Sequence, residues 1–202
     1  MLDLKGKFIV FEGIDGSGKT ELTRSLKEHL ERRAKTVWVT SEPTEWFRSY
    51  VDILKDLRDP VSLFLLFTID RNTHQKEISQ KLGEFDYVIS DRYLFSSYAY
   101  QGYMLKDFFK TFNDAFKWMK DVSNIITVRP DLTFYISIDV KTAVERINRV
   151  RQMDELEKLF NLGRVKEIYE KYLKDEMITI DGLKEKSAVL QDVMDYIDSE
   201  KK

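Results

Sequence analysis

Cysteine is absent from the 202-residue sequence, which excludes disulfides, zinc–thiolate sites and a cysteine nucleophile. A chain without cysteine also fits a reducing compartment, so we expect a cytoplasmic protein. Proline and glycine are scarce, with three and eight residues, and no linker or low-complexity segment divides the chain. We therefore expect residues 1–202 to form a single domain.

Long hydrophobic runs are missing as well. The apolar run at residues 8–11 is too short for a signal-peptide core or a membrane span, so we expect no membrane partner. The formal net charge is −2, so no overall basic field recruits nucleic acid. Apolar residues make up 43% of the chain and charged residues 34%, which is typical of a globular protein.

Short apolar runs alternate with stretches of helical spacing. Strands are predicted at residues 7–12, 36–40, 85–90, 132–138 and 177–180. Helices are predicted at residues 20–33, 61–82, 105–120, 143–150, 156–173 and 183–197, and residues 61–69 are apolar nearly all round, which predicts burial on both sides. The alternation predicts an α/β protein with three α/β/α layers and a five-stranded parallel sheet. Ligands of such sheets bind at the carboxyl ends of the strands.

A phosphate-binding loop follows the first predicted strand. The pattern G-x-x-x-x-G-K-T lies between strand and helix and comprises Gly13, Ile14, Asp15, Gly16, Ser17, Gly18, Lys19 and Thr20. Its backbone N–H groups and the following helix N-terminus suit the phosphates of ATP. Lys19 is expected to reach the β- and γ-phosphates, and the Thr20 hydroxyl to ligate Mg²⁺.

A second polar group follows the third predicted strand. Asp91 is positioned to hold Mg²⁺ through water, and Arg92 to clamp a phosphate. GTPases, motors and kinases all use a phosphate loop. The chain has no Asn-Lys-x-Asp guanine signature and is small for a motor, which favours a small kinase.

Four ordered stretches resemble the thymidylate kinase family. They are the phosphate loop with its preceding Phe11-Glu12, the segment Leu66-Phe67-Thr68-Ile69-Asp70-Arg71, the segment at residues 91–102 (DRYLFSSYAYQG), and Arg129-Pro130-Asp131 at the start of the fourth strand. The resemblance covers residues 7 to about 172 and implies a nucleoside monophosphate kinase that uses ATP and Mg²⁺ to phosphorylate dTMP. It also implies a homodimer.

The resemblance implies roles for the substrate-binding residues. Phe67 would stack on thymine and Arg71 would bond its O4; the two are four residues apart and share a helix face. Ser97 would address thymine N3. The remaining assignments place Tyr100 near the sugar, Gln101 in the same pocket, Asp15 at the sugar 3′-hydroxyl and Arg48 at the acceptor phosphate. The chain departs from the family around Arg48, where the loop after the second strand is shorter and lacks the usual glycines.

A charged segment at about residues 146–156 resembles the family's lid. Some relatives carry an arginine in the phosphate loop and others carry basic residues in the lid. Because this loop has Gly16 at that position, the resemblance implies that the lid supplies the catalytic cation, with Arg149 and Arg151 favoured over Arg146. The catalytic group would then comprise Lys19, Arg92, Asp15, Arg149 and Arg151.

Two other functions stay open at this level. Another nucleotide kinase, or a deoxynucleoside kinase, would share the fold, and the latter needs a general base that Glu12 or Asp15 could provide. A protein that only binds ATP would lack phosphate transfer, although the acceptor motifs and the lid arginines favour an enzyme.

Overall fold

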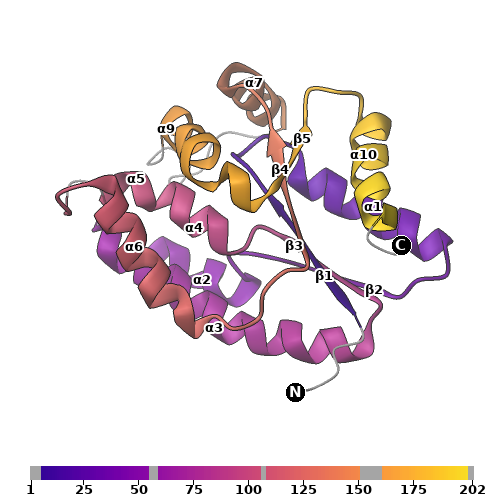
Figure 1. The fold of residues 1–202 in the computed structure, drawn as a ribbon, viewed down its shortest axis with the longest axis horizontal. Coiled ribbons are helices and arrows are strands. Elements are labelled where there is room, and N and C mark those ends of the chain that lie inside the picture. Colours follow the sequence, from indigo (N-terminus) through magenta and orange to yellow (C-terminus); the bar gives the residue numbers. More distant parts are fainter. Residues whose placement is uncertain (1–5, 55–58, 106–107, 151–160, 200–202) are drawn as a thin grey trace.

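A five-stranded, all-parallel sheet forms the centre of the computed structural model, which describes residues 6–54, 59–105, 108–150 and 161–199 (Figure 1). Its order is β2-β3-β1-β4-β5, with β1 (Lys7–Glu12) in the middle. The other strands are β2 (Val37–Ser41), β3 (Tyr87–Asp91), β4 (Leu132–Ser137) and β5 (Ile178–Asp181). Phe11 lies opposite Asp91 in the ladder, so the segments that follow β1 and β3 are neighbours. The predicted parallel α/β fold is confirmed.

Alternate residues of the strands pack on opposite faces of the sheet. Ile9 and Phe11 contribute to one hydrophobic core with α1 (Lys19–Arg32) and α10 (Lys186–Ser199). Phe8 and Val10 contribute to the other core, on the face of the remaining helices. Both cores contain side chains that are completely buried, as expected for a parallel sheet covered on both sides.

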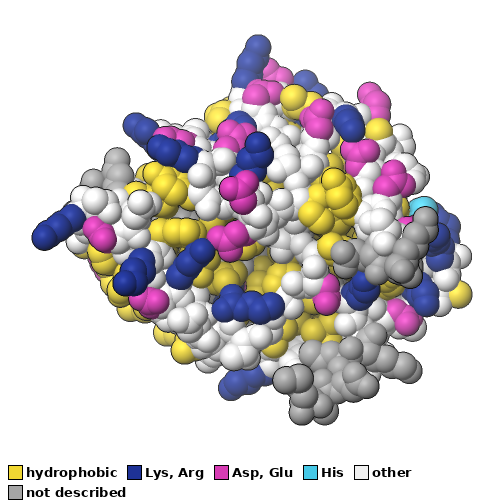
Figure 2. Space-filling model, viewed as in Figure 1, with side chains coloured by type: hydrophobic (Ala, Val, Ile, Leu, Met, Phe, Trp, Pro, Cys, Tyr) yellow, Lys and Arg dark blue, Asp and Glu magenta, His cyan; other side chains and the backbone are white. Residues whose placement is uncertain are grey.

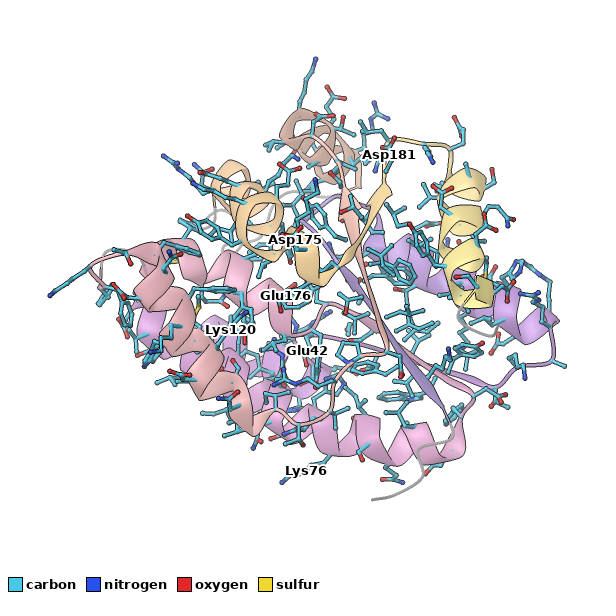
Figure 3. The ribbon with its side chains drawn as sticks, viewed as in Figure 1. Glu42, Lys76, Lys120, Asp175, Glu176 and Asp181 are labelled. Carbon is cyan, nitrogen blue, oxygen red and sulfur yellow. The ribbon has the colours of Figure 1, made fainter. Side chains whose placement is uncertain are left out.

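The second face is covered by a larger group of helices, most of them at the left of Figure 1 and α7 at its top. They are α2 (Glu45–Leu54), α3 (Pro60–Glu84), α4 (Leu94–Tyr100), α5 (Gly102–Leu105), α6 (Phe112–Val122), α7 (Val140–Val150) and α9 (Leu162–Ile168). Short turns follow α6 and α9, namely η1 (Ser123–Ile125), the π-helical η2 (Tyr169–Leu173) and η3 (Lys174–Glu176). Lys120 of α6 pairs with Glu176 of η3 at 2.8 Å, and Figure 3 labels both residues.

Several predicted boundaries differ from the structure because capping side chains set them. The helix expected from residue 105 begins at Phe112, since the Thr111 side chain accepts a hydrogen bond from the Asp114 N–H. The helix expected at residues 156–173 is described from Leu162, capped by Asn161, and becomes a π-helical turn at Tyr169. Three helices were not predicted: α2, α4 and α5.

The outer surface corrects one further prediction. Helix α3 is not buried on both sides at residues 61–69, because Leu65 and Ile69 are 40% and 55% exposed. They are four residues apart and share one face of the helix. On the face viewed in Figure 2, basic and acidic side chains are interspersed. No helix in the described part of the chain is both long and apolar enough to cross a membrane.

Candidate active site

The phosphate loop joins β1 to α1 at the carboxyl edge of the sheet. Its tightest point is Gly16, where φ is +79° and a Cβ atom would lie 2.4 Å from the backbone oxygen of Ala143. A side chain at this position would therefore have to displace the backbone of α7. The loop cannot carry an arginine here in this conformation, which agrees with the glycine in the sequence.

Lys19 lies within the loop rather than above it. Its Nζ donates to the carbonyl oxygens of Gly13 and Ile14 at 3.0 and 2.9 Å and to Ser17 Oγ at 3.2 Å. The residue is only 5% exposed, and burial lowers the pKa of its ammonium group to about 8. A buried cation among neutral acceptors favours an incoming polyanion, because the phosphates would stabilise the charged form.

Thr20 and Asp91 meet at the mouth of the loop although they are 71 positions apart. The Thr20 hydroxyl donates to Asp91 Oδ2 at 2.5 Å, while Asp91 Oδ1 is buried and has no hydrogen-bond partner among the described residues. A hydroxyl beside a carboxylate oxygen with free lone pairs fits Mg²⁺, which uses few protein ligands when phosphates supply others. The described residues contain no group of three or more His, Cys, Asp or Glu side chains that could hold a metal ion.

Arg92 connects the phosphate loop to the segment that follows β3. Its Nη1 donates to the Gly13 carbonyl at 3.2 Å and to Ser96 Oγ at 3.1 Å. Its Nη2 lies 2.5 Å from Asp15 Oδ1 and 3.2 Å from the Tyr100 hydroxyl. The Tyr100 hydroxyl in turn donates to Asp15 Oδ2 at 2.7 Å. The structure thus brings Asp15, Arg92 and Tyr100 into one cluster, and the arginine holds the pKa of Asp15 below its usual range against the effect of burial.

Arg71, on α3, is almost completely buried, with 1% of its surface exposed. Its Nε and Nη2 pair with Glu42 Oε2 at 2.7 and 2.6 Å, and Nη2 also donates to the Tyr93 carbonyl at 3.0 Å. Figure 3 labels Glu42 in the interior of the molecule. Arg71 Nη1 is buried without a hydrogen-bond partner among the described residues, and so is Gln101 Oε1. One unpaired donor and one unpaired acceptor are what a base carbonyl and a ring N–H require.

Phe67 and Ser97 are the other residues that the resemblance assigns to the base. Phe67 is half-buried, and its ring lies 5.4 Å from that of Phe47, so it has both a packing partner and an accessible part. Ser97 is 2% exposed, and its carbonyl accepts the Gln101 N–H at 3.0 Å. Phe67 therefore packs against the buried Phe47 and also keeps part of its surface accessible to a ligand.

Arg48 lies on α2, close to the end of β2. Its Nε donates to the Pro43 carbonyl at 3.0 Å and its Nη2 to Ser41 Oγ at 3.2 Å. The short loop after β2 is fixed by Asp70, which accepts the Thr44 N–H at 2.9 Å and the Thr44 hydroxyl at 2.5 Å. A buried carboxylate therefore holds the start of this loop, a role that the sequence did not reveal.

The basic residues of α7 are placed differently from one another. Arg146 lies beside the phosphate loop, with Nη1 3.5 Å from the Ser17 carbonyl and Nη2 3.0 Å from the Gly182 carbonyl. Arg149 is exposed at the end of the helix. Arg151 and the rest of the expected lid up to residue 156 lie outside the described residues. Of the two lid arginines that the structure describes, the contact with the loop is made by Arg146, which the sequence analysis favoured less than Arg149.

A phosphate loop that lies beside a second cluster of cations and polar groups at the carboxyl edge of a parallel sheet defines a P-loop kinase of the nucleoside monophosphate type. The model of the family described as thymidylate kinase matches residues 11–193. The chain is 39% identical over 191 residues to the probable thymidylate kinase of Thermoplasma acidophilum, which covers 94% of this chain and 95% of that protein. It is 40% identical over 191 residues to that of Thermoplasma volcanium, covering 94% and 96%, and 36% identical over 195 residues to probable thymidylate kinase 1 of Saccharolobus solfataricus, covering 95% and 96%. The chain belongs to the thymidylate kinase family.

Proposed function

We propose that the protein transfers the γ-phosphate of ATP to dTMP, producing ADP and dTDP for dTTP synthesis. The observation that carries this proposal is the contact of Arg92 with the Gly13 carbonyl at 3.2 Å. Arg92 belongs to the segment expected to bind the acceptor phosphate, and it lies within hydrogen-bond distance of the loop that binds ATP. This arrangement suits in-line transfer between two bound phosphates.

Arg71 and Gln101 select the base. Thymine presents O4 as an acceptor and N3–H as a donor, which complements the free Arg71 Nη1 and the free Gln101 Oε1. Cytosine presents the opposite pattern at both atoms, and so would leave two buried polar groups unpaired. Phe67 stacks on the ring, and Ser97 contributes at N3.

Asp15 and Tyr100 hold the sugar, and Arg92 and Arg48 hold the acceptor phosphate. The carboxylate of Asp15 accepts from the 3′-hydroxyl, while the Tyr100 ring occupies space next to the sugar. Arg48 lies at the carboxyl edge near β2, where it completes the binding of the acceptor phosphate opposite the phosphate loop.

Transfer itself requires positioning and charge stabilisation more than proton chemistry. The nucleophile is an acceptor phosphate oxygen that is already ionised, so no strong general base is needed. Lys19 and Arg92 stabilise charge on the transferred group, and Arg149 or Arg151 adds the further cation that Gly16 cannot provide. Thr20 and Asp91 would hold Mg²⁺, which would supply positive charge to neutralise the phosphates. Arg146 supports the donor nucleotide from its place beside Ser17.

A deoxynucleoside kinase is disfavoured by the surroundings of the two carboxylates that could act as its base. Both oxygens of Glu12 accept hydrogen bonds from protein groups, and Asp15 is paired with Arg92. A substrate panel tests the choice directly. We expect coupled ADP release to be fastest, as kcat/KM, with dTMP among all nucleoside monophosphates; faster reaction with AMP, GMP or thymidine would refute the proposal.

We further propose that the protein is a cytoplasmic homodimer that pairs through the exposed face of α3. Leu65 and Ile69 supply an apolar surface there, and a self-complementary surface of this kind suits a twofold dimer. Light scattering after gel filtration should give twice the chain mass. Ile69→Glu should yield monomers, whereas Leu183→Glu, at a residue that is 54% exposed elsewhere, should not. A monomeric wild type would refute the dimer.

A further inference from the structure

Glu12 is a buried carboxylate that the proposed reaction does not use. It is the last residue of β1 and has no exposed surface. Its Oε1 accepts the N–H groups of Tyr93 and Ser96 at 3.0 and 3.1 Å. Its Oε2 accepts the hydroxyls of Ser96 and Tyr169 at 2.6 and 2.9 Å. Four donors therefore satisfy both oxygens, and they come from the start of α4 and from η2.

The Ser96 hydroxyl connects Glu12 to Arg92. The Ser96 Oγ atom donates to Glu12 and accepts from Arg92 Nη1 at 3.1 Å. A hydroxyl has a single proton, so donating it to the carboxylate turns the oxygen lone pairs toward the guanidinium. Charge at both ends of such a chain strengthens its hydrogen bonds. Removing the hydroxyl would release one of the contacts that orient Arg92.

The backbone of Arg92 also needs external support. Its φ is +73°, in the left-handed region that side-chain-bearing residues rarely adopt. The Arg92 N–H donates to the Phe11 carbonyl at 2.9 Å, and the Arg92 carbonyl accepts the Ser90 hydroxyl at 2.6 Å. Strain of this kind persists where the surroundings fix the residue, and it concentrates at functional sites.

Tyr169 reaches the same carboxylate from far along the chain. It is completely buried, begins the π-helical turn η2, and its ring stacks on that of Tyr135 at 5.0 Å. π-Helical turns within helices are frequent at functional sites. Burial raises the pKa of Tyr169 well above its usual value, so the hydroxyl remains a donor to Glu12. Tyr169 is also 3.1 Å from Ser96 Oγ.

We infer that Glu12, Ser96 and Tyr169 form a positioning set that holds Arg92 at the phosphate loop, so that the Ser96 and Tyr169 hydroxyls serve phosphate transfer rather than ATP binding. In this arrangement the three residues act through Arg92, which Ser96 contacts directly. The inference rests on the proposed function, since it assigns Arg92 to the transferred or accepting phosphate.

The test compares kcat with the KM for ATP in single variants. For Ser96→Ala we expect kcat to fall about tenfold and for Tyr169→Phe about three- to tenfold, because small misplacement of a positioned group is costly, with the KM for ATP within about twofold of wild type. Ser96→Thr keeps the hydroxyl and should retain kcat within about threefold. Tyr135→Phe is the matched control, because it removes a neighbouring tyrosine hydroxyl that does not reach Glu12 in the described structure.

Each outcome decides the inference. Equal losses in Ser96→Thr and Ser96→Ala, or in Tyr135→Phe and Tyr169→Phe, would show a packing role and overturn it. A kcat near wild type in both Ser96→Ala and Tyr169→Phe would overturn it as well. If Ser96→Ala does not fold, Tyr169→Phe against Tyr135→Phe carries the test alone. An inactive wild type with dTMP would instead refute the proposed function, so the two failures are distinguishable.

Discussion

Replacing Arg71 should damage both stability and dTMP recognition, and a second substitution should separate the two effects. The Arg71 and Glu42 side chains are only 2% and 3% exposed. Arg71→Met leaves Glu42 buried with His74 as its remaining side-chain partner, at 3.0 Å. Removing one member of a buried ion pair costs about 3–5 kcal/mol. For a domain of this size each kcal/mol lowers Tm by about 2–4 °C, so we expect a fall of about 6–20 °C.

The double variant Glu42→Gln/Arg71→Met should recover part of the lost Tm, because it replaces an unpaired buried carboxylate with a neutral amide that keeps His74 as a hydrogen-bond partner. It should not recover activity. A hydrogen bond from a charged donor contributes about 1.5–3 kcal/mol, so kcat/KM for dTMP should stay about 10- to 150-fold below wild type. Thermal unfolding and coupled ADP release measure the two effects.

Arg33→Met provides the control, since the exposed Arg33–Asp198 pair at 2.9 Å should contribute less than about 1 kcal/mol. If the double variant regains both Tm and kcat/KM, the free Nη1 of Arg71 does not read the base and the reasoning is wrong.

Five further variants test how the protein binds ATP and transfers its γ-phosphate. Lys19→Ala should lower kcat by about 10²–10³, the usual effect of losing a preorganised charge stabiliser, and near-normal turnover of a folded variant would contradict this. Arg146→Ala should mainly raise the KM for ATP, whereas kcat should fall in Arg149→Ala or in Arg151→Ala if the expected lid supplies the catalytic cation; retention of kcat within about threefold in both would exclude that source. Gly16→Ala should lower both Tm and activity, because its Cβ would lie 2.4 Å from the Ala143 carbonyl; an unchanged Tm would show that the loop adapts.

The fold and the phosphate loop were predictable because their signals are local. A short apolar run followed by the glycine pattern predicts both strand and loop, and β1 has the predicted bounds Lys7–Glu12. Helix ends set by a single capping residue, such as Thr111 before α6, were placed wrongly because aromatic spacing suggested an earlier start. Short helices such as α5 (Gly102–Leu105) offer too few turns for a periodic pattern.

The contacts that organise the site could not be predicted, because they join residues far apart in the chain. Glu42 and Arg71 are 29 positions apart, and Glu12 and Tyr169 are 157 apart. Neither glutamate carries a local signal that distinguishes a buried partner from a surface charge. The family resemblance named Arg71, and the position after the third strand named Arg92, as binding residues, but only the fold identifies the side chains that hold them.

The close approach of Gly16 to α7 also constrains how this protein can evolve. Placing an arginine in the phosphate loop at Gly16 would need only a single substitution in the sequence. In this chain that change is blocked by the backbone of Ala143, which no side-chain substitution removes. An evolving lineage would first need a change that moves the start of α7 away from the loop, and only then could position 16 accept an arginine. Geometry therefore sets the order of the two mutations, because a side chain added at position 16 would clash with the Ala143 backbone unless α7 had already moved.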